Sequence, residues 1–170
     1  MHIRRWCGLV AGCVLLLVQT GCGRAEGSRF VPGDIQNNPA VSTSLPVGVD
    51  SAALSAVIGY VDALNIAVKT GDTLALRLSA QVGCGCLRIA KSFEAIYSTA
   101  NLIGATYRIT DISVVHNSSD EIRLRVVIAM SKAIHVERAS GARTTWSGAV
   151  TPTLFILQPI NGAWWIVQTE

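Results

Sequence analysis

The chain has 170 residues, of which 50% are hydrophobic and 15% are charged, and its formal net charge is +3. This length fits one domain that can bury a core of its own. A nucleic-acid-binding surface needs clustered, excess basic charge, which this chain lacks, so no nucleic-acid partner is expected.

The first 22 residues have the layout of a secretion signal. Arg4 and Arg5 form a basic start, residues 6–18 form an apolar run, and small residues come just before Cys22. The run is shorter than the roughly 20 residues that a membrane-spanning helix needs. We therefore expect residues 1–21 to be a signal peptide that is removed, which leaves a net charge of about +1 because Arg4 and Arg5 are lost.

The residues that end at Cys22 resemble a bacterial lipobox, in which the cysteine is lipidated and becomes the new N-terminus. Residues 10–13 match the lipobox letters better, but they follow Arg5 too closely to leave a signal core of about 7–15 residues. The resemblance implies an acylated Cys22 and, since two or three acyl chains hold a protein stably, a membrane anchor at the outer face of the cytoplasmic membrane. An uncleaved span and a plain secreted protein are the alternatives.

Residues 22–48 are predicted to be a flexible tether, because small and polar residues and prolines recur there. The folded domain is expected over residues 49–170. Asp50 or Ser51 is a good N-cap for a helix that ends at Gly71. Its apolar residues recur at helical spacing: Leu54, Val57, Ile58, Val61, Leu64 and Val68. A short helix through Leu78 and a third helix over about 87–100 follow, separated by a turn at 83–86.

After Gly104 the apolar pattern changes to the alternation of β-strands. Strands are predicted over 107–115, from 122 to at least 130, over 144–156 and over 164–167. The last two are joined by Asn161-Gly162, a strong hairpin signal. Pro152 indicates a β-bulge in its strand or a position at the edge of the sheet. Helices followed by antiparallel strands predict an α+β domain, with N-terminal helices packed into a strongly curved antiparallel sheet of about four strands.

This order of elements resembles the nuclear-transport-factor-2-like fold, in which a curved sheet wraps a long first helix into a cone with an apolar pocket. Residues 60–65, 70–72 and 83–86, together with Trp165, resemble a family of uncharacterised actinobacterial lipoproteins over about residues 50–170. The resemblance implies the fold and the location of the protein, and it implies no activity.

Cys84 and Cys86 are the two cysteines that remain once the signal is removed and Cys22 is lipidated. Gly85 between them permits a turn that brings the two sulfurs together, and an oxidising compartment favours their pairing. We expect a structural disulfide. A redox-active pair near a helix N-terminus and a site for Cu(I) or another soft metal are the alternatives.

No nucleophile elbow, zinc-binding helix motif or glycine-rich phosphate loop is present, so the sequence indicates no catalytic residues and no cofactor. If the cone holds an enzyme site, its candidates are Asp62, Asp111, Lys132 and His135. The candidate pocket residues are large aromatics and the lysine that falls in phase with apolar strand positions: Tyr60, Tyr97, Trp146, Trp165 and Lys132.

The leading hypothesis is a non-enzymatic, membrane-anchored lipoprotein that binds a small apolar ligand or an envelope protein. A redox or Cu(I)-binding protein built on Cys84 and Cys86 and an enzyme with a polar site inside the cone are the alternatives. A homodimer through the outer face of the sheet is a further expectation.

Overall fold

A computed structural model describes residue 46 and residues 48–170 of the chain. The predicted signal peptide (1–21), Cys22 and nearly all of the predicted tether (22–48) lie outside these residues, so their predictions stay predictions. The described residues belong to one compact unit.

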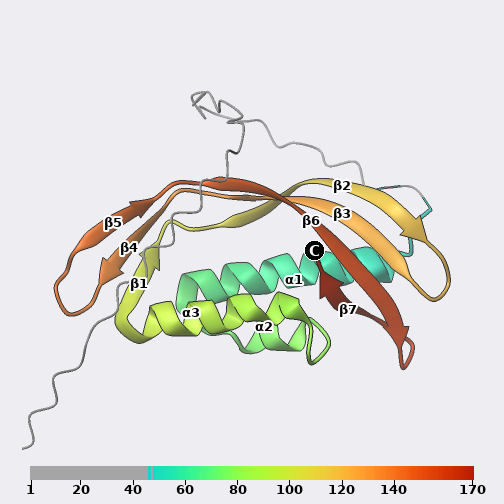
Figure 1. Cartoon of the computed structure of the whole chain (residues 1–170), viewed down its shortest axis with the longest axis horizontal. Coiled ribbons are helices and arrows are strands. Elements are labelled where there is room, and N and C mark those ends of the chain that lie inside the picture. The colour runs from blue at the N-terminus through green and yellow to red at the C-terminus, as the bar shows by residue number, and fades with distance from the viewer. Residues whose placement is uncertain (1–45, 47) are drawn as a thin grey trace, which may run out of the picture. The chain divides into compact units, whose positions relative to one another are not determined.

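The elements follow one another in the order helices, then strands. They are α1 (Ser51–Thr70), α2 (Leu74–Leu78), the 3-10 turn η1 (Gly85–Leu87), α3 (Arg88–Thr99), β1 (Ala100–Ile103), β2 (Tyr107–Asn117), β3 (Ile122–Met130), β4 (Ala133–Glu137), β5 (Arg143–Trp146), β6 (Ala149–Ile160) and β7 (Ala163–Thr169). Figure 1 shows the strands arched over the three helices, which lie beneath the concave side.

The strands form two antiparallel sheets. One has the order β2-β3-β6-β7 and the other the order β1-β4-β5. Only Ser131 and Lys132 separate β3 from β4, and only Ser147 and Gly148 separate β5 from β6, so the second sheet prolongs the first beyond two short interruptions. The α+β class and the helix-wrapped, curved antiparallel sheet of the predicted cone are confirmed. The prediction of about four strands was low for two reasons. Two long strands were expected to run without a break, and β1 was not predicted as a strand.

Helix α1 begins and ends where local chemistry requires. The carboxylate of Asp50 accepts a hydrogen bond from the backbone N–H of Ala52 at 2.7 Å. Gly71 ends the helix with a φ of 80°, a left-handed conformation that glycine adopts without cost. Asp50 also accepts a hydrogen bond from the indole N–H of Trp164 at 2.9 Å, which joins the start of α1 to β7.

Helix α1 is the core helix of the domain. Within the described part of the chain it is the one helix that is long and apolar enough to cross a membrane, but half of its apolar window is buried inside the fold. Its buried side chains, among them Val57, Tyr60, Leu64 and Val68, pack against the concave face of the sheet, where Leu124, Val126, Phe155, Leu157 and Ile166 are also buried. Burial therefore accounts for the apolar character of α1.

Two strand features in the sequence have a clear structural role. Asn161 and Gly162 both have positive φ, at 53° and 79°, as a tight hairpin between β6 and β7 requires. Pro152 pairs with Val127 of β3 on one side, and β7 reaches β6 only from Phe155 onward. The missing N–H of Pro152 therefore falls on a locally unpaired edge, as the sequence predicted.

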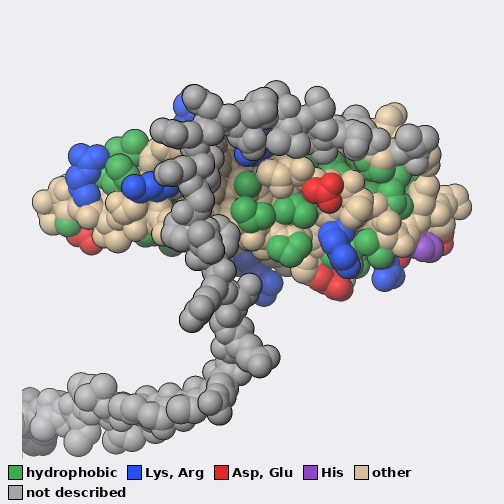
Figure 2. Space-filling model, turned by 90° about the horizontal axis from the view of Figure 1, so that it is seen from above, with side chains coloured by type: hydrophobic (Ala, Val, Ile, Leu, Met, Phe, Trp, Pro, Cys, Tyr) green, Lys and Arg blue, Asp and Glu red, His purple; other side chains and the backbone are tan. Residues whose placement is uncertain are grey.

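The outer face of the larger sheet carries both apolar and charged side chains. The register places Arg125 opposite Leu154 and Val127 opposite Pro152 on this face, and Val150 is 63% exposed. Figure 2, viewed from the sheet side, shows hydrophobic groups interspersed with acidic and basic ones. The homodimer that we expect through this face stays a prediction.

Candidate functional site

A cavity of about 510 Å³ lies between the helices and the concave face of the larger sheet. Its walls come from α1, from η1 with the first turn of α3, and from β2, β3, β6 and β7. The lining residues are Tyr60, Leu64, Gly85, Cys86, Arg88, Ile89, Tyr107, Ile128, Met130, Ala149, Thr151, Thr153, Phe155 and Thr169. Small-molecule sites have cavity volumes of about 300–1,000 Å³, so this one is large enough for a ligand.

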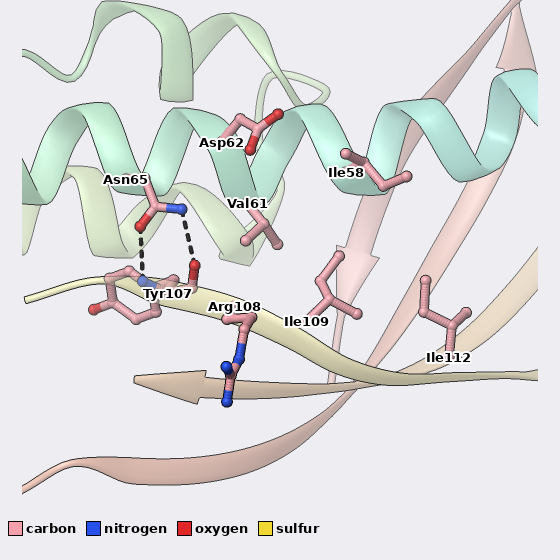
Figure 3. A pocket seen from close by; sticks show the side chains of 8 residues that line it. All are labelled: Ile58, Val61, Asp62, Asn65, Tyr107, Arg108, Ile109 and Ile112. Atoms are coloured by element: carbon pink, nitrogen blue, oxygen red, sulfur yellow. Dashed lines mark hydrogen bonds between the residues drawn. The ribbon is translucent and has the colours of Figure 1, made fainter. Parts of the chain in front are cut away.

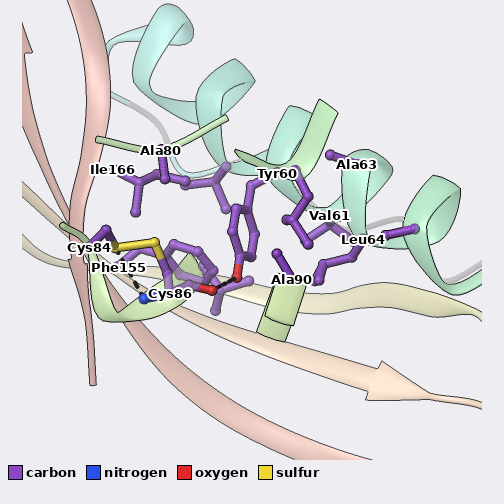
Figure 4. Packing of buried hydrophobic residues seen from close by; sticks show 14 of the residues in the cluster. Tyr60, Val61, Ala63, Leu64, Ala80, Cys84, Cys86, Ala90, Phe155 and Ile166 are labelled. Carbon is purple, nitrogen blue, oxygen red and sulfur yellow. Dashed lines mark hydrogen bonds between the residues drawn. A yellow bond between two sulfur atoms is a disulfide. The ribbon is translucent and has the colours of Figure 1, made fainter. Parts of the chain in front are cut away.

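The inner end of the cavity is apolar and well packed. The ring of Tyr60 meets the ring of Phe155 edge-on, with the centroids 5.5 Å apart. The phenol of Tyr60 donates a hydrogen bond to the carbonyl oxygen of Cys86 at 3.1 Å, as Figure 4 shows. Burial raises the pKa of Tyr60 to about 12, with a smaller contribution from Tyr107, whose own pKa burial also raises. Both phenols therefore stay protonated at neutral pH.

A few polar groups interrupt the apolar wall. Arg88 is the one lining residue with a formal charge at neutral pH. Its Nε donates to the carbonyl oxygen of Gly85 at 3.2 Å, and it has no ion pair within the part of the chain described. The hydroxyls of Thr151, Thr153 and Thr169 make no hydrogen bond to any described residue, so they are available to a ligand. An apolar cavity with a few available polar groups is typical of small-molecule sites.

No Asp, Glu or His is among the lining residues of this cavity. Asp111 is exposed on β2, and Lys132 is exposed in the interruption between β3 and β4. His135 stacks on Trp146 in the smaller sheet, with the ring centroids 5.4 Å apart. Within the described residues no three His, Cys, Asp or Glu side chains are grouped as metal ligands would be. The structure does not bring the four candidates for an enzyme site together.

Asp62 lines a second, smaller cavity of about 310 Å³ between α1 and the edge of β2, shown in Figure 3. Beside it, the side-chain amide of Asn65 makes two hydrogen bonds to the backbone of Tyr107, accepting from its N–H at 2.7 Å and donating to its carbonyl oxygen at 2.9 Å. Asn65 thus pairs with the edge of β2 as a neighbouring strand would. We assign Asn65 a structural role, because its two hydrogen bonds hold α1 on β2.

Cys84 and Cys86 form a disulfide with their Cα atoms 5.2 Å apart. Both residues are buried, at 6% and 5% exposure. The backbone N–H of Cys86 donates to Sγ of Cys84 at 3.2 Å. Thiol exchange requires access to a sulfur, so burial favours a structural clamp over the redox-active alternative.

The structure places the predicted pocket residues in several parts of the fold. Tyr60 lines the large cavity. Tyr97 instead donates to the carbonyl oxygen of Val68 at the end of α1. Trp146 stacks on His135, Trp165 lines a third cavity of about 300 Å³ beside α2, and Lys132 lies in a strand interruption. Sequence position does not reveal which aromatic side chains share a cavity, since that depends on how distant elements dock.

Sequence reasoning missed Arg88, Tyr107 and the three threonines. One signal for the threonines is present: Thr151 and Thr153 alternate in phase with the buried Phe155, so they are polar residues on the same face of their strand as a core residue. Polar side chains on a core-facing strand position indicate a cavity rather than a packed core. No comparable sequence signal marks Arg88.

Comparisons with known proteins match the fold and no sequence family. No protein-family model matches the chain, and no curated protein matches its sequence. The intermembrane-space region of the chloroplast protein ARC6 is 12% identical, with 69% of this chain and 92% of that chain covered and a TM-score of 0.51. A protein of unknown function with a cystatin-like fold from Nostoc punctiforme is also 12% identical, with 71% and 90% covered and a TM-score of 0.47. At such identity the ARC6 likeness shows the fold alone.

Proposed function

We propose that this domain is a non-enzymatic module that binds one small, largely apolar ligand in the cavity beneath the curved sheet. The observation that carries the proposal is the composition of that cavity. Its walls are apolar, and its three threonine hydroxyls form no hydrogen bond to any described residue. Acid–base catalysis needs a titratable group near neutral pH within reach of the substrate. The lining has none, because its two tyrosines are held protonated by burial.

We also propose that the domain is displayed outside the cell. The basic start, the apolar run of residues 6–18 and Cys22 support a lipid anchor at the outer face of the cytoplasmic membrane. The Cys84–Cys86 disulfide fits an oxidising compartment. Fractionation of cells that express the chain or Cys22→Ala tests the location: the parent should remain with the membrane and the variant should not. Equal distribution of the two proteins would contradict the anchor.

Binding is tested with a neutral, apolar fluorescent dye such as Nile red. Ala149 and Val150 are neighbours on β6, but Ala149 lines the cavity whereas Val150 is exposed and is absent from the lining. Ala149→Phe should fill the mouth of the cavity and abolish the dye's fluorescence increase, and Val150→Phe should retain it. The proposal fails if the parent domain does not bind the dye, or if both variants bind it equally.

A further inference from the structure

The residues that line the large cavity carry formal charge of one sign only. Arg88 contributes the one formal charge of the lining, and no described carboxylate forms an ion pair with it. The acidic residue of the same helix, Glu94, is engaged elsewhere, by Arg77 at 2.7 Å and by Thr73. Arg88 is itself exposed, so its guanidinium meets the cavity at the rim, where apolar walls on one side strengthen its attraction for an anion.

The backbone around Arg88 adds to this positive potential. Gly85, Cys86, Arg88 and Ile89 belong to the wall and form η1 and the first turn of α3, a helix of 12 residues. A helix N-terminus carries a partial positive charge. No acidic residue occupies the first turn of α3, and no side chain caps its start at Leu87. The first N–H groups of this helical run are engaged, since Leu87 donates to the carbonyl oxygen of Cys84 and Arg88 to that of Gly85. The helix end therefore adds only its partial charge, and the guanidinium is the group that can bind an anion directly at this rim of the cavity.

The rest of the cavity suits an apolar body with a few hydrogen bonds. Leu64, Ile89, Ile128, Met130 and Phe155 supply apolar contact surface. Thr151, Thr153 and Thr169 lie on β6 and β7, so their hydroxyls come from the sheet wall, and Arg88 comes from the helix wall. Because Tyr107 stays protonated, its phenol can donate a hydrogen bond but does not repel an anion.

We infer that the ligand is an amphipathic anion, with its apolar body inside the cavity and one oxyanion group, a carboxylate or a phosphate, held at Arg88. This inference rests on the proposed ligand-binding function and specifies the chemistry of the ligand. The guanidinium would hold the oxyanion through charge-assisted hydrogen bonds, and the apolar chain or ring would contribute the larger share of buried surface.

Calorimetric titration with three probes of equal chain length tests the inference: decanoate, decyl phosphate and decanol. At least one of the two anions should bind about tenfold more tightly than the alcohol, because one good charge-assisted contact is worth about that factor. Arg88→Gln should remove this advantage, so that the variant binds the anions and decanol with similar affinity. Lys91→Gln is the matched control, because Lys91 is an exposed cation one turn later on α3 that does not line the cavity.

The outcomes separate this inference from the proposed function. If decanol binds as tightly as both anions, or if Lys91→Gln weakens the anions as much as Arg88→Gln does, the amphipathic anion is ruled out and the apolar binding site remains. If none of the three probes binds and Nile red does not bind either, the proposed function itself fails. A preference for decanoate or for decyl phosphate identifies the head group.

Discussion

Tyr60 and Cys86, which are 26 positions apart, are joined by a buried hydrogen bond from the phenol of one to the carbonyl oxygen of the other. Tyr60 belongs to the core helix α1, and Cys86 belongs to the turn that the disulfide closes. The bond fixes the distance between α1 and the start of α3. Tyr60, Cys86 and Arg88 all line the large cavity, so the bond joins two of its walls.

Tyr60→Phe removes this bond and leaves the ring in place. The buried carbonyl oxygen of Cys86 loses its phenol donor, so we expect the free energy of unfolding to fall by about 1–2 kcal/mol. Urea denaturation followed by circular dichroism measures the change. Tyr107→Phe is the control, because the phenol of Tyr107 bonds to no described residue, and it should change stability by less than about 0.5 kcal/mol. Equal losses in the two variants would contradict the role of the bond.

Replacing both Cys84 and Cys86 with serine tests the clamp. The closed loop is short, so the loss of loop-closure entropy predicts a destabilisation of only about 1–2 kcal/mol with the fold intact. Denaturant unfolding of the parent with and without a reductant should reproduce this difference, and the reductant should not affect the variant. Failure to recover any folded variant would show that the clamp contributes more than its loop length implies.

Alanine substitutions at Gly71 and Gly141 distinguish the effect of backbone strain from that of a steric clash. Both have positive φ, but a Cβ at Gly71 would lie 2.6 Å from Cγ of Tyr97, whereas a Cβ at Gly141 meets nothing within 4 Å. Gly141→Ala should cost about 1 kcal/mol for the left-handed backbone alone. Gly71→Ala should cost about 2–4 kcal/mol, since crowding adds to the same strain. Thermal and urea unfolding of the two variants measure how much each substitution lowers the free energy of unfolding. Equal losses would show that the contact with Tyr97 adds nothing to the backbone strain.

Glu94 makes part of the stability depend on pH. The hydroxyl of Thr73, followed by the guanidinium of Arg77, lowers the pKa of Glu94 below its ordinary value of 4.5 in the folded state. The folded carboxyl thus binds protons less readily than the unfolded one, so its stabilisation is complete above pH 4.5 and is lost as the pH falls through the lower folded-state pKa.

Unfolding of the parent and of Glu94→Gln at several pH values measures this effect. The parent should be the more stable protein near neutral pH, and the difference should shrink as the solution is acidified. Asp62→Asn is the control, because the carboxylate of Asp62 forms no hydrogen bond to any described residue, so its variant should track the parent throughout. If the stability difference between the parent and Glu94→Gln grew as the pH fell, this would contradict a lowered pKa of Glu94 in the folded state.

Much of the domain follows from short-range patterns in the sequence. The 3.6-residue period of α1, its N-cap Asp50 and its left-handed Gly71, and the Asn161-Gly162 hairpin each depend on a few adjacent residues, and the structure shows all of them. The order of helices and strands then leaves few ways to bury the apolar faces. The class of fold can therefore be predicted from the sequence. The signal layout before Cys22 is equally local.

The candidate site is different, because its residues meet only through tertiary packing. Tyr60, Arg88, Tyr107 and Thr153 come from four elements, namely α1, α3, β2 and β6. Lys132 illustrates the limit: its phase with apolar neighbours holds only for an unbroken strand, and the chain leaves the sheet there. The sequence by itself determined the helices, most of the strand-forming segments and their order along the chain, but not β1 or the two strand interruptions. Only the docking of distant elements decided which side chains enclose the cavity, since the side-chain period along one element carries no information about its distance to another.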